Sequence, residues 1–176
     1  MSLTLDGSAG VTTNSGAVYN GIASGTAVAS TSGTSIDFTG IPSWVKRITV
    51  MFNEVSLSGT SNILIQLGTG STTYTTSGYV ATSNDFNQAN ATGGASSTSG
   101  FPVFISLAAG VFSGHMMLTL ISGNTWISSH TGKFSTTTVT MGGGSIALGA
   151  SFTAVRITTV NGTDTFDAGS INILYE

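Results

Sequence analysis

Apolar and polar side chains alternate along residues 44–55, and this period of two predicts a β-strand. The apolar positions expected on one face are Trp44, Ile48, Val50 and Phe52. Arg47, Thr49 and Asn53 point to the other face. Such a strand buries one face in a core and turns the other toward solvent, so we expect Trp44 in the core with its three partners.

Similar patterns recur to the end of the chain. A second strand is predicted over residues 62–68, joined to the first by the turn-rich sequence SLSGTS as a hairpin. Further strands are predicted over residues 101–107, 115–122, 124–130, 136–141, 145–152, 151–160 and 170–176. The dipeptide formed by Asn161 and Gly162 favours a two-residue hairpin turn. Eight or nine strands without a convincing helix indicate an all-β protein, an antiparallel β-sandwich or jelly roll.

The chain divides into two segments of unequal character. Residues 1–35 hold short apolar pairs separated by Gly, Ser and Thr, too sparse to bury a core alone. We therefore expect an extended, shaft-like connector over residues 1–35 and a β-sandwich tip domain over residues 36–176.

The composition excludes several classes of protein. Gly, Ser and Thr account for 79 of the 176 residues, and charged residues for only 6%, against about 25% in an average soluble domain. The apolar content is still high enough for folding. Four Lys and Arg residues are too few for a nucleic-acid or anionic membrane partner. The uncharged segment 101–121 is broken by Pro and Gly, and we expect two buried strands there rather than membrane insertion.

Low charge also bears on assembly. Charged side chains on exposed strands normally prevent sheets from pairing with neighbouring molecules. Because this chain has so few, we expect its edges or flat faces to be buried against identical chains in a symmetric oligomer.

Catalytic chemistry finds little support in the residues. There is no G-x-S-x-G sequence, and the two histidines, His115 and His130, lie in alternating strands. A glycan depolymerase would need two carboxylates, and Asp85, Asp164 and Asp167 are the candidates. Their alternative role is turn stabilisation or pairing with arginine. We expect no catalytic residues, no metal site and no cofactor.

Binding is easier to support. Residues 69–100 contain few aliphatic side chains and are expected to form a long surface loop. Aromatic rings can pack on sugar faces, and amides and carboxylates can bind sugar hydroxyls. The candidate receptor-binding residues in this loop are Tyr74, Tyr79, Asn84, Asp85, Phe86, Asn87, Gln88 and Asn90, with Trp126 and His130 as a second pair. In the alternative interpretation, the aromatic residues only anchor the loop to the core.

Three segments carry a resemblance to a known family. Residues 38–68, 111–133 and 155–176 resemble the C-terminal domains of tail-fibre and related receptor-binding proteins of tailed bacteriophages and prophages, and the opening LTLDGSAGVT is similar to modules that join shaft to tip. The resemblance implies a homotrimeric virion protein, made in the host bacterial cytoplasm and attached to other tail proteins. It would bind a bacterial surface glycan or protein receptor. A glycan depolymerase and a purely structural fibre or collar protein remain as alternatives.

Overall fold

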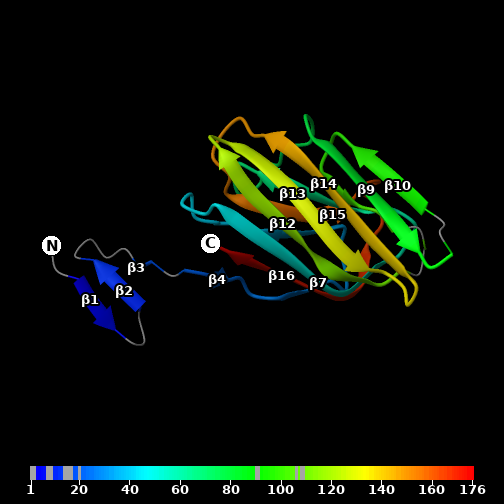
Figure 1. Ribbon diagram of the computed structural model, residues 1–176, viewed down its shortest axis with the longest axis horizontal. Helices are drawn as coiled ribbons and strands as arrows, with labels where there is room; N and C mark the ends of the chain where they lie inside the picture. Colours follow the sequence, from blue (N-terminus) through cyan, green and yellow to red (C-terminus); the bar gives the residue numbers. More distant parts are fainter. Residues whose placement is uncertain are drawn as a thin grey trace.

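The computed structural model describes residues 3–6, 10–13, 18–19, 21–89, 92–105, 107 and 110–176, and within these ranges every regular element is a β-strand. Two antiparallel sheets pack face to face around one apolar core (Figure 1). The predicted antiparallel β-sandwich is confirmed.

The larger sheet has nine strands. Its order is β10 (Thr92–Ser97), β9 (Val80–Asn87), β14 (Thr138–Ala147), β13 (Thr125–Lys133), β12 (Phe112–Ser122), β7 (Arg47–Leu57), β16 (Phe166–Tyr175) and β4 (Ala23–Ser24), with β5 (Val28–Ala29) also paired to β16. All of these neighbours run antiparallel.

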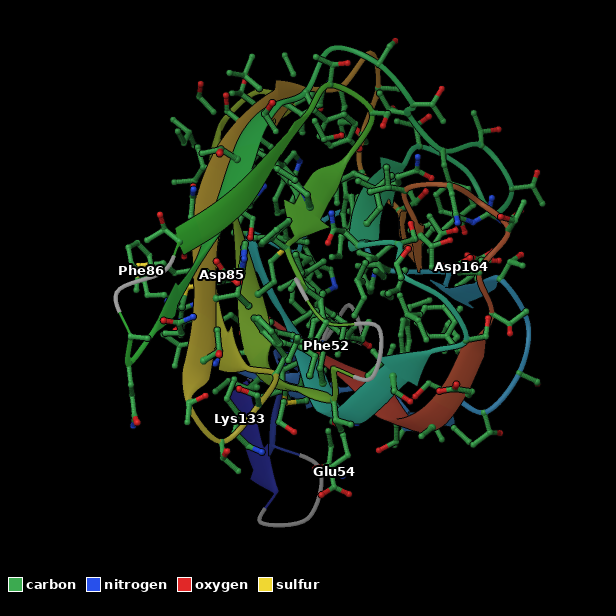
Figure 2. All side chains as sticks on the ribbon, turned by 90° about the vertical axis from the view of Figure 1, so that its right-hand side faces the viewer. Phe52, Glu54, Asp85, Phe86, Lys133 and Asp164 are labelled. Atoms are coloured by element: carbon green, nitrogen blue, oxygen red, sulfur yellow. The ribbon has the colours of Figure 1, made fainter. Side chains whose placement is uncertain are left out.

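The smaller sheet has four strands in the order β11 (Phe101–Val103), β8 (Ile63–Gly68), β15 (Ala154–Thr159) and β6 (Ser35–Phe38). Its inner face packs on the inner face of the larger sheet, where Ile48, Val50 and Phe52 of β7 are buried as predicted. The Phe52 ring meets Phe112 of β12 edge-on, with ring centroids 5.2 Å apart. Figure 2 shows Phe52 pointing into the space between the two sheets.

The N-terminal strands form a separate small sheet of β1 (Leu3–Asp6), β2 (Gly10–Thr13) and β3 (Val18–Tyr19). The second half of the expected connector behaves differently, because β4 and β5 hydrogen-bond along β16. Ser30 is buried there, and its hydroxyl donates to the carbonyl of Ala168 at 2.8 Å. Residues 23–30 thus lie along the edge of the sandwich. The division of the chain at residue 35 stays a prediction.

Both predicted hairpins at the turns SLSGTS and Asn161-Gly162 are wrong. The strands before and after each turn, β7 and β8 in one case and β15 and β16 in the other, belong to different sheets. The two crossing links are tied together, since the Ser61 N–H donates to Asp164 Oδ2 at 2.9 Å and the Asn161 N–H donates to Ser61 Oγ at 3.0 Å. A turn sequence specifies only a local reversal of the chain. Here each link instead crosses from one sheet to the other, and hydrogen bonds join the two links to each other.

Two further sequence expectations need correction. Trp44 is 49% exposed, because β7 begins only at Arg47 and Val45 enters the core instead. The segment 69–100 contains the strands β9 and β10, paired over six residues, rather than one long loop. These strands are rich in Ser, Thr, Asn and Gly and lack the apolar alternation that would have predicted them.

Candidate functional site

The predicted binding residues fall on both sides of the nine-stranded sheet. Along β9 the exposed positions are Val80, Thr82, Asn84 and Phe86, and the positions between them are buried. Figure 2 shows Phe86 pointing away from the sandwich and its neighbour Asp85 pointing in toward it. The side chain alternation of a strand therefore divides this group into an exposed set and a buried set.

The exposed set continues across the sheet. Strand pairing places Asn84 beside Met141, Met141 beside Thr131, and Thr131 beside His115. Phe86 lies beside Val139 in the next row. We call this surface the outer face and define it by its exposed residues Thr82, Asn84, Phe86, His115, Ser129, Thr131, Val139 and Met141.

A shallow depression of about 460 Å³ lies on the outer face. It is lined by the side chains of His115, Ser129, Thr131 and Met141 and by the strand segments at His130 and Gly142. Because the side chain of His130 is buried beneath the sheet and Gly142 has none, the backbone of β13 and β14 forms the floor. The walls combine one imidazole, two hydroxyls and a thioether, and none of the lining residues is an acid, a lysine or an arginine.

The buried set forms a hydrogen-bond network beneath the sheet. The Oγ of Ser83 lies 3.0 Å from Nε2 of His130 and 3.1 Å from the hydroxyl of Thr140, and it accepts a hydrogen bond from the N–H of Phe104 at 2.9 Å. All three side chains in this network are buried. A Ser and His pair of this kind can resemble a catalytic dyad, but Ser83 is fully enclosed. The side chain of His130 is thus buried within this network and is not presented on the outer face, and its role in receptor binding stays a prediction.

Burial also sets the protonation state of His130. Loss of hydration lowers the pKa of His130 to about 4, so the ring is neutral at physiological pH. Its Nδ1 has no hydrogen-bond partner among the described residues. Asp85 is buried beside the same network and accepts a hydrogen bond from the N–H of Gly93, so it too is unavailable at the surface.

Two of the predicted aromatic residues belong to the core. Tyr79 is 1% exposed, its hydroxyl accepts a hydrogen bond from the N–H of Leu67 at 2.8 Å, and its ring meets Phe101 edge-on at 5.0 Å. Trp126 is 2% exposed and packs on Phe152 with ring centroids 4.8 Å apart. The alternative interpretation, that aromatic residues anchor this part of the chain, is correct for Tyr79.

Tyr74 lies on the four-stranded side of the molecule. The guanidinium of Arg156 stacks over its ring at 4.1 Å and makes two hydrogen bonds of 2.8 Å to the carboxylate of Asp37. Partial burial, aided by the nearby charge of Asp37, raises the pKa of Tyr74 to about 12. The guanidinium of this ion pair covers one face of the Tyr74 ring.

The remaining candidates lie at the end of β9. Asn87 is partly exposed, with its side chain oxygen accepting a hydrogen bond from the N–H of Ala89 at 2.9 Å, and Gln88 is exposed. Asn90 lies outside the described residues. Of the ten candidates, Asn84 and Phe86 are therefore the ones that the structure places on the outer face.

Sequence reasoning missed six of the eight members of this face: Thr82 in β9, and His115, Ser129, Thr131, Val139 and Met141 in β12, β13 and β14. The exposure of the last five follows from the alternation in β12, β13 and β14, but their position beside Asn84 and Phe86 depends on β14 pairing with β9. The order of strands in the sheet places strands side by side that are distant in sequence, and a local sequence pattern does not predict this order.

Of the other predicted carboxylates, Asp164 stabilises a turn, and Asp167 of β16 bonds across to β7. Asp164 Oδ1 accepts a hydrogen bond from the side chain of Asn161 at 2.8 Å, and this bond, with that from the N–H of Ser61, lowers the pKa of Asp164. Asp167 is hydrogen-bonded to the hydroxyl of Ser56. In the part of the chain that the structure describes, no three His, Cys, Asp or Glu side chains gather as metal ligands would. No helix in the same ranges has the length and apolarity needed to cross a membrane.

Comparison with known proteins identifies no relative: no family model matches the chain, and neither the curated proteins nor the solved structures contain a significant match.

Proposed function

We propose that this protein is an adhesive tip domain of a virion tail fibre that binds a bacterial surface glycan through the outer face of its nine-stranded sheet. The observation that carries this proposal is the character of that face, which combines exposed apolar side chains with amide, imidazole and hydroxyl groups. The resemblance of the sequence to phage tail-fibre domains supplies the biological setting.

The outer face offers the two kinds of contact that sugars require. The apolar faces of sugar rings can pack on Phe86, Val139 and Met141, which are 44%, 43% and 46% exposed. Around them, the amide of Asn84 and the hydroxyl of Thr131 can exchange hydrogen bonds with sugar hydroxyls. A broad, shallow surface of this kind suits a repeating polysaccharide better than a small ligand, which needs a deep pocket.

Several copies acting together would compensate for a weak single site. In the homotrimer that the resemblance implies, three linked sites can exceed the affinity of one by roughly 10²-fold or more when all engage. A light-scattering mass of a single chain at every concentration would contradict the trimer.

Binding of fluorescently labelled protein to a panel of bacteria tests the proposal. We expect the double variant Asn84→Ala, Phe86→Ala to lose at least tenfold in cell binding while remaining folded by circular dichroism. Val160→Ala with Thr163→Ala is the matched control, because both residues are exposed and lie at the link between β15 and β16. If both double variants lose cell binding equally, the outer face is not the binding site.

The two alternative functions have separate outcomes. Release of new reducing ends from host polysaccharide would indicate a depolymerase, although Asp85 is buried, Asp164 stabilises a turn and Asp167 bonds to Ser56 of the neighbouring strand. Failure to bind any strain of the panel would favour a purely structural fibre or collar protein.

A further inference from the structure

The four edges of the two sheets differ in the features that hinder pairing with another chain. The larger sheet ends at β4 and β5 on one side, and each of these strands has only two residues. The smaller sheet ends at β11, which has three residues and contains Pro102, and at β6, where Asp37 carries a charge paired to Arg156. Short strands, proline and charge are the features by which exposed edges resist pairing with other chains.

The fourth edge, β10, has none of these features. It is six residues long, its sequence is TGGASS, and it contains neither proline nor a formal charge. All six residues pair with β9 on one side, and β10 is the last strand of the sheet, so its other side faces outward (Figure 1). The small side chains leave the backbone of this free edge accessible.

Charge is also absent from the exposed surface next to this edge. The one charged residue in β9 and β10 is Asp85, which is buried and accepts a hydrogen bond from the N–H of Gly93 within the same pair of strands. Two copies of this edge can therefore approach each other without like-charge repulsion.

We propose that β10 pairs antiparallel with β10 of a second copy of the chain, which joins two nine-stranded sheets into one. The free N–H and C=O groups of an edge strand are complementary to those of another extended strand. Because the other three edges are short, contain proline or carry a charge, the partner edge in the second copy is β10 itself. Two identical antiparallel strands are related by a two-fold axis, so both edges are occupied at once and the association stops at a pair.

This contact stands apart from the proposed function. It does not depend on glycan binding, and a two-fold contact is distinct from any contact around a three-fold axis. The pairing is therefore detected as a mass twice that of a variant in which β10 cannot pair. This ratio is the same whether the variant is a monomer or a trimer.

Hydrogen exchange of the unmodified protein gives the first test. We expect the amides of β10 that point away from β9, at alternate positions within residues 92–97, to become at least tenfold more protected as the protein is concentrated from the micromolar to the millimolar range. Amides in the centre of the sheet, in β12 and β13, should not change. Exchange in β10 that is independent of concentration overturns the proposal.

The second test blocks the edge with charge. Thr92 and Ser96 are exposed on β10, and the double variant Thr92→Lys, Ser96→Lys should show half the mass of the unmodified protein by sedimentation velocity at high concentration. The control places the same two lysines at Ser151 and Thr163, which are exposed outside the strands, and it should keep the full mass. Equal masses for the edge variant and the control overturn the pairing, whereas loss of bacterial binding bears only on the proposed function.

Discussion

The Oγ of Ser83 and Nε2 of His130 lie 3.0 Å apart beneath the nine-stranded sheet, joining strands β9 and β13 from opposite sides of β14. The middle strand permits this contact because Gly142 stands between the two residues in the register. A Cβ at Gly142 would collide with the His130 ring. The side chains of Ser83 and His130 can thus meet across β14 because Gly142 has no side chain, and the three residues pack together.

The burial of His130 makes the stability of the protein depend on pH. The folded pKa is about 4, below the ordinary value of about 6.5, so the unfolded chain takes up a proton first as the pH falls. We expect the free energy of unfolding to decrease by about 3 kcal/mol between pH 7 and pH 4 because of this residue alone. Urea denaturation at a series of pH values measures the change.

The variant His130→Gln is the control for that prediction, since it keeps hydrogen-bonding groups but does not titrate. Its stability should vary with pH much less than that of the unmodified protein. A pH dependence that survives the substitution unchanged would assign the effect to other groups.

Glu54 offers a position where stability can be gained. Its φ of 53° is in the left-handed region, which costs a non-glycine residue about 1–2 kcal/mol. Figure 2 shows its side chain pointing outward from the sandwich. We expect Glu54→Gly to raise the free energy of unfolding by about 1 kcal/mol, measured by urea denaturation, and Glu54→Ala to give no such gain because alanine keeps the backbone penalty.

Gly132 tests the packing of the core. A Cβ there would meet the ring of Phe112 and the backbone oxygen of Ser113, so Gly132→Ala should destabilise the fold by about 1–3 kcal/mol through overpacking. Gly149→Ala is the matched control, because nothing lies within 4 Å of its added Cβ. Thermal unfolding that is the same in both variants would contradict this account of the contact with Phe112.

The contacts of Arg156 predict a difference between arginine and lysine. Lysine cannot reproduce the two parallel hydrogen bonds to Asp37 or the planar stacking on Tyr74. Because the ion pair is about one-third exposed, we expect Arg156→Lys to cost only about 1 kcal/mol of stability. The variant Arg156→Gln removes the positive charge that lowers the pKa of Tyr74, so it should move the ultraviolet titration of this tyrosine to higher pH, whereas Arg156→Lys keeps a positive charge.

Local alternation in the sequence determined the fold class and the buried faces of the most apolar strands. Ile48, Val50 and Phe52 in β7 and Ile171 and Ile173 in β16 are buried as their spacing predicts. Large branched and aromatic side chains at every second position can be removed from water only if the strand presents one face to a core, so the sequence alone is sufficient there.

Only the tertiary structure decided which strands share a sheet and which binding candidates are exposed. Turn sequences specify local reversals, but both links cross between the sheets, where the N–H of Ser61 in one link donates to Asp164 in the other. In β9, polar side chains follow one another from Thr82 to Asp85, so the sequence could not distinguish the exposed Asn84 from the buried Ser83. That distinction follows from which side of β9 faces the other sheet, a property of contacts between segments far apart in the chain.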